Sequence, residues 1–160
     1  MDRESIAGVN SPALQGVFTG QFAHSLDPKK RLTIPSGWRD QVGEPRRLLV
    51  LPGIEAKCLY VYPSRDAMQR MQKFTDISIA DGKARQFARV IGSRSELVEW
   101  DVQGRIRVKD DLLEYAELSN QVVLVGVFNA FELWNPDRFK QQIGLSDQAS
   151  LGEAARYVGF

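Results

Sequence analysis

Apolar and polar positions alternate on both sides of an Asp-Pro turn near the start of the chain. Phe18, Phe22 and Leu26 precede the turn, and Leu32 and Ile34 follow it on one face. A period of two residues is typical of strands, and a turn between two such runs indicates a hairpin-like loop. The pattern therefore predicts a strand, a short loop and a second strand.

The same layout recurs 74 positions later. Asp27 and Arg31 in the first loop correspond to Asp101 and Arg105 in the second, and each Arg precedes two apolar residues two positions apart. The apolar run 48–51 keeps this offset from the run 122–125. Register held over such a distance indicates an internal repeat, in which two copies of one supersecondary unit bury a shared core.

The remaining periodicity predicts the other elements. Helices are predicted at 35–42, 64–74, 81–92 and 110–117, and further strands at 48–51, 57–62, 122–128 and 131–134. Ser64 and Asp81 are predicted to cap the helices that they begin. Met68, Met71 and Phe74 are three residues apart, and this apolar stripe predicts a core-facing side.

Composition then narrows the class of protein. The 160 residues are 43% hydrophobic and 26% charged, as in ordinary globular domains, and the net charge of +1 favours no class of partner. The single cysteine, Cys58, excludes an internal disulfide and is predicted to be a buried small hydrophobe. We see no apolar run long enough to cross a membrane and no export signal, so we expect no membrane partner and a cytoplasmic location.

Candidate chemistry for an enzyme is sparse. One histidine, His24, and one cysteine cannot supply a tetrahedral metal site, and no glycine-rich phosphate loop has the usual spacing. Asp110 and Asp111 lie at a predicted helix start, where the helix dipole favours negative charge. We therefore expect a non-enzymatic protein without a metal or cofactor.

Positive charge gathers instead on the first loop. Between residues 27 and 39 the net charge is +3, whereas between 101 and 117 it is −2. Cations on a tip between strands can reach DNA phosphates, and Arg can also bind guanine bidentately. The candidate DNA-binding residues are Lys29, Lys30, Arg31, Arg39 and Arg105, and the candidate loop-orienting residues are Asp27 and Asp101. The charge difference predicts that the first copy dominates DNA binding.

Several stretches together resemble the MraZ family of bacterial transcriptional regulators, which is built from two SpoVT/AbrB-type DNA-binding units. They are residues 18–39, 58–63, 85–89, 101–105 and 122–134. Lys30 departs from the family pattern, which usually has Gly there, and Lys109 stands where a Pro would follow the strand. Since Gly often supplies a positive φ, the shape of the first loop is a point for the structure to decide.

The resemblance implies an α+β fold: a pseudo-twofold tandem repeat of swapped-hairpin, AbrB-like β-barrel units with short helices. On this basis we divide the chain into five segments. They are an N-terminal tail (1–16), a first repeat (17–66), a connecting helical segment (67–96), a second repeat (97–140) and a C-terminal tail (141–160) that includes one helix around 151–157.

The resemblance also implies a function. Family members bind double-stranded DNA at short direct repeats in a promoter, typically that of the division and cell-wall gene cluster, as ring-shaped homo-oligomers associated with the nucleoid. Carried over by position, the family's Asp-x-x-x-Arg motif falls on Asp27 and Arg31 and on Asp101 and Arg105. Two alternatives stay open: a ring-forming scaffold that has lost DNA binding, and an antitoxin of the related single-copy kind, which the fused repeat disfavours.

Overall fold

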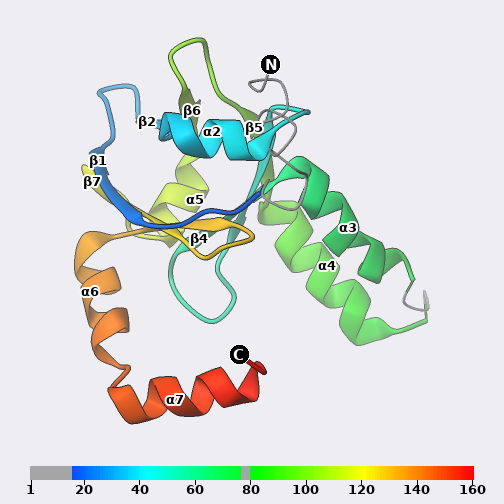
Figure 1. The fold of residues 1–160 in the computed structure, drawn as a ribbon. Coiled ribbons are helices and arrows are strands. Elements are labelled where there is room, and N and C mark those ends of the chain that lie inside the picture. Colours follow the sequence, from blue (N-terminus) through cyan, green and yellow to red (C-terminus); the bar gives the residue numbers. More distant parts are fainter. Residues whose placement is uncertain (1–15, 77–79) are drawn as a thin grey trace, which may run out of the picture.

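The computed structural model describes residues 16–76 and 80–160 and contains a six-stranded sheet, a two-stranded sheet and several helices (Figure 1). In chain order the elements are β1 (Gln21–Ser25), β2 (Arg31–Thr33), α2 (Ser36–Val42), β3 (Arg47–Pro52), β4 (Leu59–Pro63), α3 (Ser64–Thr75), α4 (Gly82–Arg94), β5 (Glu96–Glu99), β6 (Arg105–Arg107), α5 (Asp110–Tyr115), β7 (Gln121–Gly126), β8 (Phe131–Trp134), α6 (Pro136–Gly144) and α7 (Gln148–Tyr157). The predicted α+β class is confirmed.

The two copies exchange their first strands. β1 of the first copy pairs with β7 of the second, with Phe22 opposite Leu124, and β5 of the second pairs with β3 of the first, with Val98 opposite Leu48. The strand order β1-β7-β8-β4-β3-β5 therefore reads the same from either end when the copies are interchanged. This confirms the tandem repeat with swapped hairpins. β1 and β5 lie at opposite edges of the sheet, so the sheet is open and not closed into a barrel.

The pseudo-twofold axis passes through the small sheet of β2 and β6. Leu32 lies opposite Ile106, its own counterpart in the other copy, and both are buried. On either side of this pair, Arg31 lies opposite Arg107 and Thr33 opposite Arg105. β2 and β6 are antiparallel, so the loops that precede them join opposite ends of this small sheet. Since each strand has only three residues, the two loops still lie close together.

The main core lies between one face of the large sheet, the small sheet, α2 and α5. It includes Leu32, Ile34, Trp38, Leu48, Val50, Leu59, Val61, Ile106, Leu112, Val122, Leu124, Phe131 and Leu133. Phe18 and Trp38 pack their rings on Phe131 at centroid distances of 5.4 Å and 4.7 Å. Each fully buried side chain of this size contributes about 1.5–3 kcal/mol, so both copies depend on one shared core.

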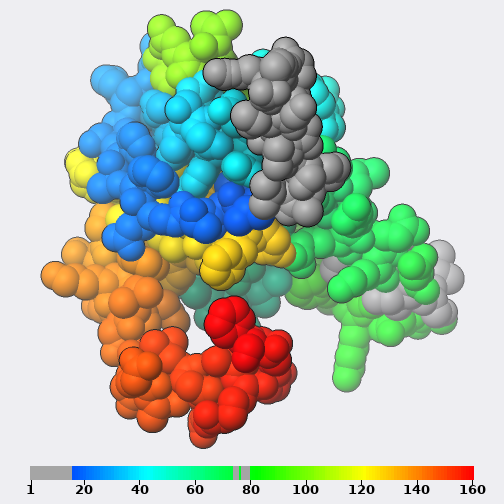
Figure 2. Space-filling view, in the orientation of Figure 1, coloured from blue at the N-terminus to red at the C-terminus, as the bar shows by residue number. Residues whose placement is uncertain are grey.

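The other face of the large sheet is covered unevenly. α3 and α4 pack on β3 and β4 of the first copy, and α6 packs on β7. The ring of Phe139 in α6 also contacts that of Trp134 in β8, at a centroid distance of 5.6 Å. Figure 1 shows the α3–α4 pair and the α6–α7 pair leaving opposite ends of the sheet. α7 has no buried residue, and Figure 2 shows it projecting from the body of the molecule.

Some local predictions are confirmed. Asp81 caps α4, since its Oδ1 accepts a hydrogen bond from the Ala84 N–H at 3.0 Å. Cys58 is fully buried, and a helix is present around 151–157 as part of α7. Apart from Gly16, the predicted N-terminal tail lies outside the described residues. No helix in the described ranges is long and apolar enough to cross a membrane.

Two predictions for α3 are wrong. Ser64 is the first residue of the helix, and its buried hydroxyl has no hydrogen-bond partner among the described residues. Met68 and Met71 are 71% and 39% exposed, so they do not face a core, and the side chain of Phe74 lies outside the described residues. The spacing was correct for an apolar stripe, but Met68 and Met71 are exposed, and Met71 lines an open groove.

Candidate nucleic-acid interface

A carboxylate fixes the shape of the first loop. Oδ1 of Asp27 accepts hydrogen bonds from the backbone N–H groups of Lys29 (2.9 Å) and Arg31 (2.7 Å), and Oδ2 accepts one from Nε of Arg31 (2.6 Å). These bonds, the one from the Arg31 N–H first, lower the pKa of the Asp27 carboxyl, so it stays ionised at neutral pH. Asp27 thus binds both the loop backbone and the arginine side chain.

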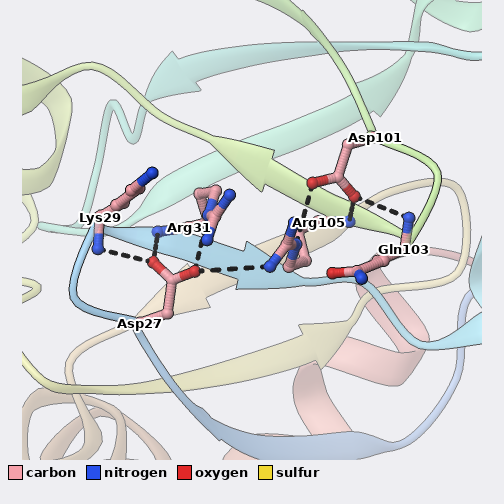
Figure 3. A network of polar contacts seen from close by, with 6 residues as sticks. All are labelled: Asp27, Lys29, Arg31, Asp101, Gln103 and Arg105. Carbon is pink, nitrogen blue, oxygen red and sulfur yellow. Dashed lines mark hydrogen bonds and ion pairs between the residues drawn. The ribbon is translucent and has the colours of Figure 1, made fainter.

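The second loop repeats this network atom for atom. Oδ1 of Asp101 accepts from the N–H groups of Gln103 and Arg105, both at 2.9 Å, and Oδ2 accepts from Nε of Arg105 at 2.9 Å (Figure 3). The pKa of Asp101 is lowered as well, again mainly by the backbone N–H of the arginine. All of these bonds span two or four residues, so each loop builds its own geometry.

The fourth residue of each loop has a positive φ. Lys30 has φ 61° and Gly104 has φ 81°, and their N–H groups donate to the carbonyl oxygens of Asp27 (2.8 Å) and Asp101 (2.9 Å). Lys30 therefore adopts the conformation that Gly usually supplies, at a cost of about 1 kcal/mol relative to Gly. The departure from the family pattern leaves the loop's shape unchanged.

Arg39 lies over the second loop. Its Nε donates to the carbonyl oxygen of Ile34 at 3.1 Å, and a Cβ on Gly104 would lie 2.6 Å from its Cζ. Arg39 is half-buried in this position. The cation predicted for the first copy's binding surface is therefore beside the second copy's loop.

The two loops also meet each other. Nη1 of Arg105 is 3.9 Å from Oδ2 of Asp27, which already binds Nε of Arg31 (Figure 3). The side chains of Arg31 and Arg105 are 30% and 26% exposed. Each arginine uses Nε for its aspartate and keeps further N–H groups for another acceptor. The structure thus brings Asp27, Arg31, Asp101 and Arg105 into one cluster, with exposed Lys29 and Lys30 beside it.

Sequence reasoning missed one ionic group at this surface. Oδ1 of Asp110 binds Nη2 of Arg107 at 2.8 Å and Nζ of Lys30 at 3.4 Å. These two cations, Arg107 first, lower the pKa of the Asp110 carboxyl. The spacing of three between Arg107 and Asp110 was a signal for that pair. The contact with Lys30 spans 80 residues and depends on the pairing of the small sheet.

No group of three or more His, Cys, Asp and Glu side chains that could hold a metal ion occurs within residues 16–76 and 80–160. The cluster contains no histidine and no nucleophile beside a base. Its chemistry is that of a rigid cationic surface with carboxylates holding the arginines in place, which can bind an anion through charge-assisted hydrogen bonds.

Comparison with known proteins shows the family to which this chain is similar. The family model described as "MraZ protein, putative antitoxin-like" matches residues 17–90 and again residues 93–158. Relatives named "Transcriptional regulator MraZ" include one from Halothermothrix orenii, 36% identical over 123 residues that cover 77% of this chain and 84% of that protein. The one from Finegoldia magna is 33% identical over 78% of this chain and 85% of its own length, and the one from Clostridium acetobutylicum is 32% identical over 90% and 100%.

Proposed function

Because this chain belongs to the MraZ family of transcriptional regulators, we propose that it binds DNA sequence-specifically through its paired loops and regulates transcription. The observation that carries the proposal is the duplicated loop, in which an aspartate holds an arginine in place, with the two loops close together. A side chain that is already oriented loses less entropy on binding. A regulator of this kind has no catalytic role.

Arg31 is the principal DNA contact in this proposal, aided by Lys29 and Lys30. With Nε bound to Asp27, the remaining N–H groups of Arg31 can bind a guanine bidentately or a phosphate. Arg39 and Arg105 add positive charge over the second loop, where Arg39 is held by the Ile34 carbonyl. Lys29 and Lys30 supply phosphate contacts, which position the protein without reading sequence.

The full proposal includes assembly. One small cationic patch binds weakly, and linked copies multiply its affinity without any new contact when the sites are suitably spaced. We therefore propose a homo-oligomeric ring that binds short direct repeats in a promoter, that of the division and cell-wall gene cluster, in the nucleoid. Repeats about one helical turn apart, ~10 base pairs, would present successive sites on one side of the DNA.

The direct test titrates the full chain with duplex DNA from upstream of its own reading frame, using fluorescence anisotropy. Arg31→Ala should weaken binding strongly, whereas Arg85→Ala, which removes an exposed cation on α4, should leave it nearly unchanged. Light scattering on the same samples gives the assembly state. If the protein forms a ring but binds this DNA no better than an unrelated duplex, the proposed regulator is wrong and the scaffold alternative is favoured.

A further inference from the structure

An open apolar groove lies between the α3–α4 pair and the outer face of the sheet. Its volume is about 490 Å³, its floor includes Leu49, Leu51 and Tyr60, and its helical walls include Met71, Phe87 and Ile91. Exposed apolar surface of this kind on a folded domain commonly marks a binding site. Met71 of α3, which is 39% exposed, lines this groove, and Met side chains adapt their shape to a partner.

An amphipathic helix elsewhere in the chain, α7, is not covered by any of the residues that the structure describes. In α7 and at its C-terminal end, Leu151, Ala154, Ala155 and Val158 follow the i, i+3, i+4, i+7 spacing of one helix face. Leu151 is 52% exposed and Val158 is 70% exposed. The two alanines make the middle of this stripe narrow, which lets the helix approach another backbone closely.

The pseudo-symmetry of the fold relates the two features. The α3–α4 pair follows β4 and the α6–α7 pair follows β8, so the pairs hold equivalent places in the two copies. In the first copy the second helix, α4, returns to pack on β3. In the second copy α7 buries no residue and lies away from the sheet (Figures 1 and 2). The first copy thus has an open groove beside α3 and α4, whereas the second copy has a helix, α7, that does not pack on the sheet.

The charge around the groove indicates which surface can bind there. The two charged residues that line the groove, Arg70 and Lys73 of α3, are both cations. Two such grooves placed face to face would bring these cations together, which disfavours a symmetric contact. From 147 to 158, by contrast, Asp147 and Glu153 outnumber Arg156. α7 therefore offers an apolar stripe without adding positive charge.

We propose that the groove binds α7 of a second copy of this chain. Since groove and helix are different surfaces, the contact is heterologous, and it passes from copy to copy and closes into a ring when the rotation allows it. The inference rests on the self-association proposed above and names the two surfaces that make it. It does not depend on the loops or on DNA.

Engineered disulfides test the contact directly. In the double variant Met71→Cys/Leu151→Cys, mild oxidation with copper phenanthroline should link copies covalently and give a ladder on a non-reducing gel. The matched control is Met71→Cys/Ala149→Cys, which places the second thiol on the opposite face of α7. The native Cys58 is fully buried and gives no background. A fast-migrating monomer band would show α7 in its own chain's groove, and equal ladders in both variants would show random collisions; either result overturns the proposal.

Substitution gives the second readout. Leu151→Glu and Val158→Glu should reduce the mass from that of the assembly toward that of the single 18.0 kDa chain, because a carboxylate would enter the apolar groove. Ala149→Glu makes the same charge change on the opposite face and should leave the mass unchanged. Circular dichroism confirms that the variants fold. If the assembly survives Leu151→Glu and no ladder forms, the docking contact is wrong while the ring stands. If the unaltered chain is a monomer at micromolar concentration, both fail.

Discussion

The first and second loops have one geometry but different surroundings. Each is held by an aspartate that binds two backbone N–H groups and an arginine Nε. In the first, the residue with positive φ is Lys30, whose side chain reaches Asp110. In the second it is Gly104, which lies against Arg39. The shape thus needs the aspartate, whereas the residue tolerated at the fourth position depends on what lies above it.

The comparison also changes the meaning of the charge difference between the copies. The sequence assigns +3 to one loop region and −2 to the other. In the fold, Arg39 of the first region lies on the second loop, and Asp110 of the second region binds Lys30 of the first. The two regions therefore share one surface, and single substitutions are needed to measure how unequal they are.

The largest expected effect is on DNA affinity. Arg31→Ala should cost about 1–3 kcal/mol of binding free energy, or roughly five- to 150-fold in Kd, if Arg31 contacts a base. Arg105→Ala should cost at most about fivefold, because its neighbours Gln103 and Gly104 are uncharged whereas Lys29 and Lys30 precede Arg31. Anisotropy titrations with one operator duplex measure both. Equal losses would mean that the two loops contribute alike.

The next effect is on stability. Gly104→Ala should lower the free energy of unfolding by about 1–2 kcal/mol, since it strains a positive φ and displaces the Arg39 side chain from its place. Lys30→Gly, at the equivalent position, should raise it by up to about 1 kcal/mol. Urea denaturation followed by circular dichroism gives both values. A similar loss from both substitutions would contradict the difference drawn between the loops.

Adding Arg39→Ala separates the two causes. In the double variant Gly104→Ala/Arg39→Ala the steric part of the loss should disappear and the backbone strain should stay, because only the first depends on a neighbour. Coupling between the two substitutions is the quantity to measure. Strict additivity would place the whole cost in the backbone.

A smaller effect concerns salt. Replacing Lys29 and Lys30 by Gln should reduce the slope of log K against log salt by roughly two units, about one for each lysine that no longer binds a phosphate. Gln103→Lys makes the second loop resemble the first and should increase the slope by about one unit. Affinities over a salt series decide this. An unchanged slope in both variants would place the phosphate-binding residues elsewhere.

The smallest expected effect comes from Asp110. Its carboxylate forms ion pairs with Arg107 and Lys30. Asp110→Asn should therefore free both cations and tighten DNA binding by about two- to fivefold at low salt. Asp111→Asn is the matched control, with the same change of charge one residue along α5. If both variants tighten binding equally, the gain is a long-range effect of net charge and not the release of this pair.

Much of the fold followed from local pattern. The strands and their alternation, the short helices and the cap at Asp81 were predicted because each depends on residues within one or two turns of the chain. The failures in α3 had the opposite origin. Met68 and Met71 have core spacing, but spacing does not specify whether a surface exists for the stripe to cover. The same limit applies to α7, whose apolar face is not covered by residues 16–76 or 80–160 of its own chain.

By itself the sequence determined the repeat, the family and the internal geometry of each loop. The geometry of the first loop depends on hydrogen bonds between Asp27 and Arg31, which are only four positions apart in the sequence. Only the tertiary structure decided which copy's strand pairs with which, that Arg39 lies on Gly104, and that Asp110 binds Lys30. These contacts join residues 46 or more positions apart. These contacts form because folding buries one shared core around the Leu32–Ile106 pair. Since that core includes residues from both copies, no single segment of the sequence specifies the contacts.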